Sequence, residues 1–120
     1  MLKRILIAED EPLTRKNITA WLCDLGYEVR SANDGAEAVK LLNSSRFDLV
    51  VSDIRMPHVD GFAVLSYLRS MSPTTPFVVI SAHEPDKIFL LKMGRAVFLR
   101  KPLLLGELEG KIRFLLELEL

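Results

Sequence analysis

Polar side chains that could do chemistry together stand at the ends of four apolar stretches of the chain. Glu9 and Asp10 follow ILIA directly, and Asp53 follows LVVS. Ser81 ends FVVIS, and Lys101 follows AVFLR. Three carboxylates gathered at one place would repel one another by roughly 4 kcal/mol per pair at 4 Å and an effective dielectric constant near 20. One lysine cannot neutralise all three, whereas a divalent cation can.

Phosphoryl transfer is the chemistry that suits this set. Mg²⁺ commonly takes one or two carboxylates, waters and a phosphate oxygen. The transfer needs mainly in-line positioning and charge neutralisation, which a metal, a lysine and a hydroxyl supply. Any one of these residues alone is more simply explained as a solvated turn residue. Acid, acid, hydroxyl and lysine at four strand ends favour a magnesium site that receives a phosphoryl group.

The elements that must position these residues alternate along the chain. Stretches rich in Val, Ile and Phe predict strands covered on both faces, and we expect them at residues 3–8, 28–31, 48–52, 77–81 and 96–99. Apolar stripes with helical spacing lie between and after them. These stripes are Ile18, Trp21, Leu22 and Leu25; Ala38, Leu41 and Leu42; Val64, Leu65, Leu68 and Met71; residues 85–93; and Leu105, Leu108, Ile112 and Leu115.

This alternation predicts an α/β fold, a doubly wound five-stranded parallel sheet with helices on both faces. Ligands of such sheets bind beyond the carboxyl ends of the strands, so the polar strand ends should meet there. The second strand delivers only Ser31 and Ala32 to that edge and is expected at the margin, whereas the first is expected in the buried centre. Pro12 should begin the first helix and Gly26 end it, which makes Glu11 a helix N-terminal acid outside the site.

Length and composition restrict the class of protein. The 120 residues suit one domain, so residues 1–120 are treated as a single domain, either complete or the N-terminal part of a longer protein. Lys and Arg equal Asp and Glu at 16 each, and without a basic excess direct contact with nucleic acid is not expected. Cys23 alone cannot form an internal disulfide and fits a cytoplasmic protein. Neither a membrane-spanning run nor a signal peptide is recognisable.

The ordered motifs resemble the receiver domain of two-component response regulators over essentially the whole chain. The resemblance lies in LIAEDEP, DIRMPHVDG, VVISA and FLRKP, in that order. It implies a (βα)₅ flavodoxin-like fold and a phosphorylation-dependent signalling switch. A sensor histidine kinase or a phosphotransfer protein would supply the phosphoryl group, with Mg²⁺ or Mn²⁺ as cofactor. The domain would not be an enzyme, although it would assist its own phosphorylation and dephosphorylation.

The resemblance also implies a role for each matching residue. Asp53 would accept the phosphoryl group from a phosphohistidine. Asp10 would bind the metal directly, Glu9 would act largely through a bound water, and the backbone carbonyl of Arg55 would be a further ligand. Lys101 would pair with Asp53 and then with a phosphoryl oxygen.

The switch residues implied by the resemblance are Ser81 and Phe98. Ser81 would donate its hydroxyl to a phosphoryl oxygen and move toward Asp53. Phe98 would turn inward at the same time, although its position equally suits an ordinary strand core residue. The peptide bond before Pro102 is implied to be cis, and Gly61 is implied to open the third helix.

Departures from the family's usual residues are few. Glu9 stands where Asp is more usual, and Ser81 where Thr is commoner, so both keep their chemistry. Arg55 and His83 lie two places after Asp53 and Ser81, at variable positions that flank the phosphoryl group in the family. Our hypothesis is that they crowd the attacking water and prolong the phosphorylated state, with Arg55 pairing with a phosphoryl oxygen or with Glu9. The simpler explanation of both is a solvated loop residue.

Alternatives to this function remain at the sequence level. A receiver-like module could bind partners without phosphorylation. A phosphatase with an aspartate nucleophile would need an acid two residues later, where Arg55 stands. A nucleotide-binding module would need a glycine-rich turn after the first strand, and AEDEP has none. In the last helix, Phe114 and Leu118 form a second apolar side, which indicates either a homodimer or an attached output domain.

Overall fold

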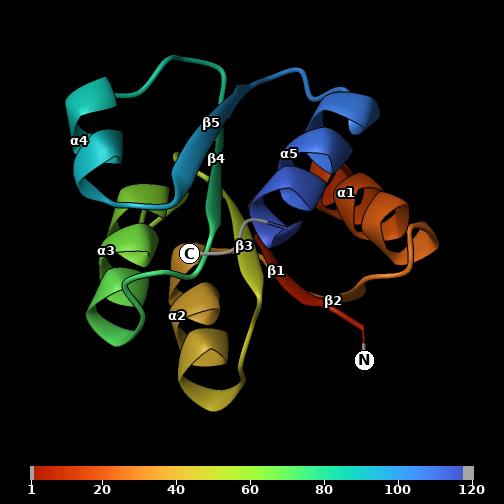
Figure 1. Ribbon diagram of the computed structural model, residues 1–120, viewed down its shortest axis with the longest axis horizontal. Coiled ribbons are helices and arrows are strands. Elements are labelled where there is room, and N and C mark those ends of the chain that lie inside the picture. Colours follow the sequence, from red (N-terminus) through yellow and green to blue (C-terminus); the bar gives the residue numbers. More distant parts are fainter. Residues whose placement is uncertain (1, 118–120) are drawn as a thin grey trace.

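The chain forms five strands and five helices in strict alternation (Figure 1). The computed structural model describes residues 2–117. The strands are β1 Arg4–Ala8, β2 Glu28–Ala32, β3 Leu49–Asp53, β4 Phe77–Ser81 and β5 Ala96–Arg100. The helices are α1 Pro12–Asp24, α2 Gly35–Ser44, α3 Gly61–Met71, α4 Lys87–Lys92 and α5 Leu105–Glu117. Apolar periodicity predicts all ten elements, and no strand end differs from its expected position by more than one residue.

All neighbouring strands are parallel, in the order β2-β1-β3-β4-β5. β2 lies at the margin, as expected from its polar end. β1 is buried and has a strand on each side, as expected, although the middle strand of the five is β3. The chain winds outward from β1 to β2 and then returns to place β3 on the other side of β1. The direction of winding therefore reverses between β1 and β3, and that reversal is where open α/β sheets bind ligands.

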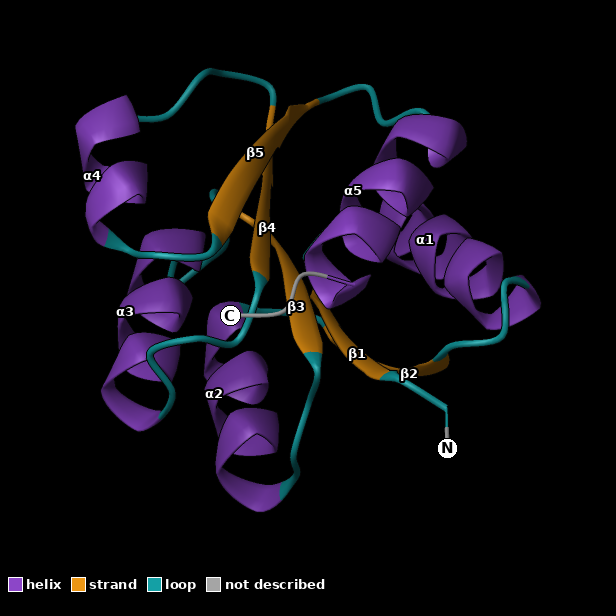
Figure 2. Cartoon of the chain, viewed as in Figure 1, coloured by secondary structure: helices purple, strands orange, loops and turns teal. Residues whose placement is uncertain are grey.

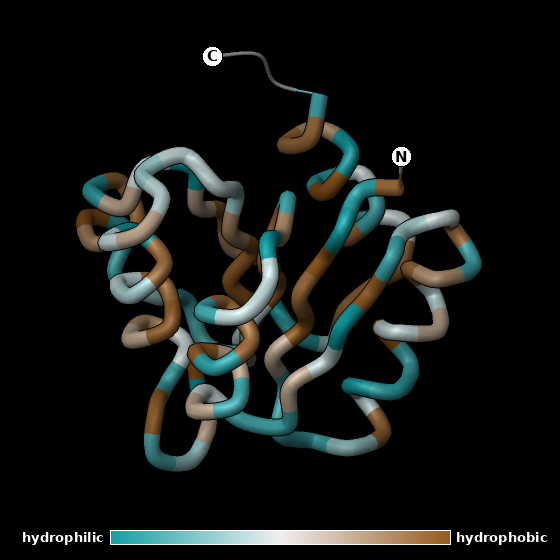
Figure 3. The backbone as a smooth tube through the Cα atoms, turned by 90° about the horizontal axis from the view of Figure 1, so that it is seen from below, coloured by the Kyte–Doolittle hydropathy of each residue, from teal (hydrophilic) through white to brown (hydrophobic). Residues whose placement is uncertain are grey.

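Two apolar layers enclose the sheet. Helices α1 and α5 cover one face, and α2, α3 and α4 cover the other (Figure 2). Successive side chains of a strand point to opposite faces: Ile5 and Ile7 join the layer with α1 and α5, whereas Leu6 and Ala8 join the opposite layer. In the tube coloured by hydropathy, brown segments run through the interior, whereas brown and teal alternate along the outer coils (Figure 3).

Acidic side chains cap four of the helices at their N-termini. Glu11 accepts hydrogen bonds from two backbone N–H groups in the first turn of α1, and Pro12 occupies the first helical position. Asp34, Asp60 and Asp86 cap α2, α3 and α4 in the same way. Each cap satisfies backbone donors that the helix itself leaves free. The expectation that Glu11 serves the helix is confirmed.

Two further sequence expectations concern helices. Phe114 on α5 leaves 59% of its surface exposed, so one of the two residues of the expected second apolar side faces solvent. Leu118, the other, lies outside the described residues. Within residues 2–117, no helix is both long enough and apolar enough to cross a membrane.

Candidate functional site

The polar strand ends meet at the carboxyl edge of the sheet. Asp53 is the last residue of β3, and Glu9 and Asp10 follow β1. One carboxylate oxygen from each of these three residues lies within 4.8 Å of the other two. Ser81 ends β4 and Lys101 follows β5 at the same edge. The register of the parallel strands therefore assembles the set that the sequence suggests.

Lys101 joins the two buried acids of this cluster. Its Nζ donates to Asp53 Oδ2 at 2.7 Å and to Glu9 Oε1 at 2.8 Å. The sequence predicts the first contact but not the second, which depends on the longer arm of Glu9. The predicted alternative, a pairing of Arg55 with Glu9, does not occur among the described residues, because Lys101 and the backbone N–H of Glu11 engage the Glu9 carboxylate instead.

Glu9 is the most deeply buried member of the cluster, with none of its surface exposed. Burial raises the pKa of Glu9 to about 7; the hydrogen bond from Lys101 opposes the rise, and Asp53 adds to it. For Lys101, burial acts to lower the pKa, but its hydrogen bonds to Asp53 and Glu9 and their charges outweigh burial and raise it. The site thus holds a fixed positive charge between two carboxylates, one of which readily takes a proton at neutral pH.

Two contacts with the main chain position the segments that carry the acids. Arg15 reaches back from α1 and donates through Nη1 to the Glu9 carbonyl at 2.8 Å. Gly61 starts α3 so close to β3 that a Cβ at this position would lie 2.2 Å from the carbonyl oxygen of Asp53. The family resemblance predicts the position of Gly61 but not the contact of Arg15. Sequence motifs do not show which side chain will donate to a main-chain carbonyl.

A cavity of about 190 Å³ opens above Asp53, lined by Arg55, Ser81, Ala82, His83 and Lys101. Asp53 Oδ1 accepts from the backbone N–H of Arg55 at 3.2 Å, and Ser81 Oγ accepts from the backbone N–H of His83 at 3.2 Å. The Arg55 and His83 side chains are exposed at its mouth. The structure therefore brings both variable residues to the cavity, with room for a small group above the carboxylate.

One β5 residue, Phe98, is expected in the switch. Phe98 is half-buried against the apolar layer of α2 to α4, and the guanidinium carbon of Arg100 lies 6.0 Å from its ring centroid. The peptide bond between Lys101 and Pro102 is cis, as the resemblance implies. Lys101 N–H donates to the carbonyl of Ser81 at 2.8 Å, which ties the end of β5 to that of β4.

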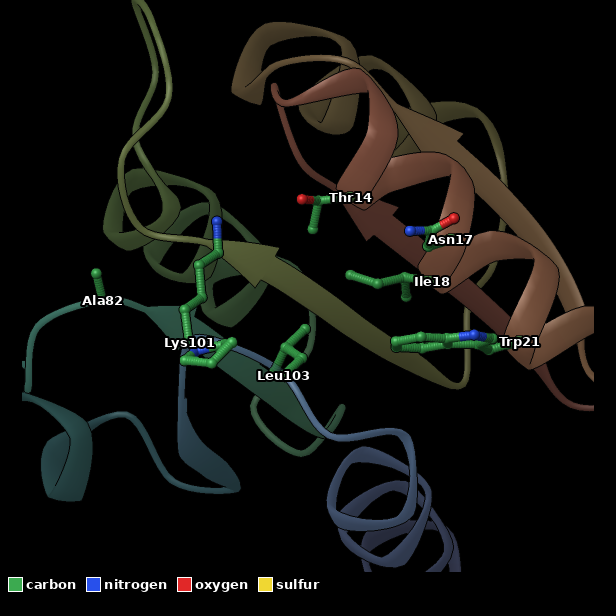
Figure 4. Close-up of a pocket in the computed structure, with 8 residues that line it drawn as sticks. Thr14, Asn17, Ile18, Trp21, Ala82, Lys101 and Leu103 are labelled. Carbon is green, nitrogen blue, oxygen red and sulfur yellow. The ribbon is translucent and has the colours of Figure 1, made fainter.

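A larger groove of about 530 Å³ adjoins this cavity between α1 and the segment after β5 (Figure 4). Ile18 and Trp21 form one wall, and Leu103 faces them from the other (Figure 4). Lys101 and Ala82 line both the groove and the cavity above Asp53. An apolar surface therefore leads directly to the acidic cluster.

The donor set suits a hard divalent cation. Carboxylates and a backbone carbonyl are the oxygen ligands that Mg²⁺ prefers. Glu9 and Asp53 are buried while Asp10 is exposed, so part of a cation held here could keep its waters. The cluster of three acids with one lysine also leaves negative charge for a cation to neutralise.

Comparison with known proteins gives the same family. The family model described as response regulator receiver domain matches residues 5–113. The chain is 37% identical over 115 residues to response regulator MprA of Mycolicibacterium vanbaalenii, covering 94% of this chain and 50% of MprA. It is 33% identical over 103 residues to sensor histidine kinase RcsC of Escherichia coli, covering 84% of this chain and 11% of RcsC. The chain thus spans half or less of these curated relatives.

A solved structure has the same fold. The receiver domain of sensor histidine kinase PA1611 from Pseudomonas aeruginosa, which has a magnesium ion coordinated in its active site cleft, superposes with a TM-score of 0.85. The two chains are 28% identical, and the match covers 97% of this chain and 98% of that one. With the parallel five-stranded sheet and the acidic cluster at its carboxyl edge, the chain belongs to the response regulator receiver domains, the phosphoaccepting modules of two-component systems.

Proposed function

We propose that Asp53 accepts a phosphoryl group from a histidine of a partner protein and that the chain acts as a phosphorylation-dependent switch. The observation that carries this is the Asp53 carboxylate itself. It is only 6% exposed, it accepts from Lys101 Nζ at 2.7 Å, and it faces a small cavity beside two further acids. Lys101 donates to the Asp53 carboxylate and holds its own charge beside the place where phosphoryl oxygens would arrive.

The transfer is a displacement at phosphorus. A carboxylate oxygen of Asp53 forms a bond to phosphorus, the bond from phosphorus to the donor imidazole nitrogen breaks, and the imidazole leaves with the electron pair. Lys101 stays within reach of both the carboxylate and the transferred group. Release of the phosphoryl group to water completes the cycle, so the domain assists its own phosphorylation and dephosphorylation without being an enzyme that acts on other molecules.

Asp10, Asp53 and the carbonyl of Arg55 would hold Mg²⁺, with Glu9 acting largely through a bound water; Mn²⁺ would serve in the same place. When bound, the cation neutralises the acids and the phosphoryl oxygens together. Glu9 would be ionised in that state. Its raised pKa means that it can instead carry a proton while the cation is absent.

The switch would begin at Ser81. Its hydroxyl oxygen now accepts from the backbone N–H of His83, and the nearly two negative charges of an acyl phosphate give the hydroxyl hydrogen a stronger acceptor. Movement of the β4 end toward Asp53 would free space behind it. The half-buried ring of Phe98 could then turn inward, away from Arg100.

The donor would be a sensor histidine kinase or a phosphotransfer protein. The groove beside α1 supports this, because it is apolar and shares Lys101 and Ala82 with the phosphoacceptor cavity. A partner seated there would bring its histidine over Asp53. Output through a homodimer or an attached domain would use α5, where Phe114 is exposed. We place the domain in the cytoplasm and treat residues 1–120 as one receiver domain.

Phosphorylation by a small donor tests the proposal. The protein is incubated with Mg²⁺ and acetyl phosphate, and intact mass is measured for the wild type, Asp53→Asn and the matched control Asp24→Asn. We expect one phosphate adduct on the wild type and on Asp24→Asn and none on Asp53→Asn. Equal labelling of Asp53→Asn would contradict the assignment, and no labelling of any variant would favour the phosphorylation-independent module.

A further inference from the structure

Two arginines meet at the end of the sheet opposite the phosphoacceptor. Arg69 belongs to α3 and Arg95 immediately precedes β5. Arg69 donates to the carbonyls of Met93, of Ser72 at 3.3 Å and of Thr75 at 2.6 Å. It therefore connects the turn before β5 to the loop that follows its own helix.

Arg95 makes a similar set of contacts. It donates to the carbonyl of Thr74 at 3.3 Å and to the carbonyl of Leu115 near the end of α5. All hydrogen bonds of both guanidinium groups within residues 2–117 go to main-chain carbonyls. None goes to a carboxylate, and no ion pair of the described residues includes either arginine.

No carboxylate of the described residues therefore neutralises the positive charge of this pair. Arg69 Nη2 and Arg95 Nε are buried and reach no acceptor within the described part of the chain. Burial lowers the pKa of Arg69, and the charge of Arg95 lowers it further. Two neighbouring like charges without an anion repel each other, and a bound anion would reduce that repulsion.

A cavity of about 390 Å³ lies beside Arg95, between the ends of α2 and α3; Arg69 does not line it. Arg95 lines it together with Arg46, whose guanidinium makes no hydrogen bond within residues 2–117, and with five other polar residues. These are Ser45, Asp48, Ser72, Thr74 and Thr75. Asp48 is the only acid in the lining, and its Oδ2 already accepts from the backbone N–H of Arg4 at 2.8 Å. The lining therefore holds two guanidinium groups and one carboxylate, so positive charge exceeds negative charge there.

We propose that this cavity binds a small oxyanion, inorganic phosphate or a phosphate monoester, through Arg95 and Arg46. Guanidinium groups match the geometry of phosphate oxygens, and the nearby hydroxyl of Thr74 adds a donor of adjustable direction. The Thr75 hydroxyl already pairs with that of Ser72 at 2.7 Å. The site lies at the opposite end of the sheet from Asp53 and does not depend on the phosphoacceptor proposal. An anion there would brace the loops before β4 and β5 and the end of α5.

Phosphate titration followed by amide NMR tests this site. The Asp53→Asn protein without Mg²⁺ is titrated with inorganic phosphate, and in a second arm with glycerol phosphate, against chloride at matched ionic strength. We expect saturable shifts at the amides of Thr74, Thr75 and Arg95, and an affinity about tenfold weaker in Arg46→Gln and Arg95→Gln. The two arms distinguish free phosphate from a monoester.

The control is Arg113→Gln, which removes an exposed arginine that pairs with Glu109 on α5. Shifts that are absent, that appear only at the Asp53 edge, or that keep the same affinity in Arg46→Gln and Arg113→Gln would overturn the proposal. The long-range hydrogen bond of Arg46 uses its main-chain carbonyl, which Arg46→Gln keeps. This variant should therefore fold, and it tests the proposal even if Arg95→Gln does not fold.

Discussion

At the scale of single residues, Glu9 is the most unusual member of the site, because it is an acid without exposed surface. The sequence places it in the site, yet its partner there could not be read from the sequence. Lys101 lies 92 positions away, and only the distance between the β1 and β5 ends decides that the Glu9 side chain reaches it. The more usual Asp has a shorter side chain, so the contact between Glu9 and Lys101 depends on the Glu that this chain has at position 9.

The pKa of Glu9 makes the stability of the metal-free protein depend on pH. Folding raises this pKa from 4.5 to about 7, so between these values the folded state binds a proton that the unfolded state has released. The free energy of unfolding therefore falls as pH rises through this window, by about 3 kcal/mol at most. Glu9→Gln cannot ionise at this position, so above pH 7 its free energy of unfolding should exceed that of the wild type by up to that amount.

Urea unfolding with a chelator present, repeated across the window, measures this difference. Subtracting the two proteins at each pH cancels the groups that they share. The gap should be small near pH 4.5 and should grow until about pH 7. A gap that stays constant with pH would show that Glu9 titrates normally in the folded state.

Arg55 and His83 are the residues that we propose to set how long a phosphoryl group on Asp53 would last. Both line the cavity above Asp53, where their side chains would limit the line along which water attacks phosphorus. We expect the double variant Arg55→Ala, His83→Ala to lose its phosphoryl group several-fold faster than the wild type. The measurement is the decay of the phosphorylated mass after removal of the donor, with Arg113→Ala on α5 as control. An unchanged or longer lifetime would contradict this hypothesis.

At the scale of elements, apolar runs give the positions of the strands, because a strand covered on both faces has little room for polar residues. They do not give the order of the strands. The run ILIA correctly indicates a buried interior strand, but it does not tell β1 from the middle strand β3, since such a run is the same in any interior strand. α4 is shorter than expected because Asp86 caps a helix that begins at Lys87, within the stretch read as helical from Pro85. Caps of this kind are visible only once the turn geometry is known.

The start of α3 is the element boundary on which the site depends most. Replacing Gly61 by Ala would place a Cβ at 2.2 Å from the Asp53 carbonyl and at 2.8 Å from Ile54 Cα. Both are backbone atoms that cannot move alone, so we expect a loss of about 1–3 kcal/mol in unfolding free energy and slower phosphorylation. Gly110→Ala on α5 is the matched control, because a Cβ added there would meet nothing within 4 Å and the substitution should gain roughly 0.5–1 kcal/mol. Equal effects of the two substitutions would contradict this account.

At the scale of the whole molecule, the parallel topology explains why residues from four separate strands form one site. Carboxyl ends of parallel strands share an edge, and this much follows from the alternation of elements alone. The sequence pattern does not predict the pair Arg69 and Arg95 at the other end, because their acceptors are main-chain carbonyls, which every residue has. Sequence patterns record which side chains are apolar, whereas contacts to the backbone emerge only with the tertiary structure.

The two ends of the sheet differ in charge, and the acidic end should make stability depend on Mg²⁺. A cation that binds the folded state alone stabilises it in proportion to the logarithm of its concentration, by about 2.7 kcal/mol at a hundred times its dissociation constant. We expect this gain for the wild type in urea unfolding at constant ionic strength and its loss in Asp10→Asn, which removes one of the three converging carboxylates. Asp24→Asn on α1 should keep the gain. The same Mg²⁺ dependence in Asp10→Asn would mean that the cation acts elsewhere on the molecule, because general screening is already held fixed by the constant ionic strength.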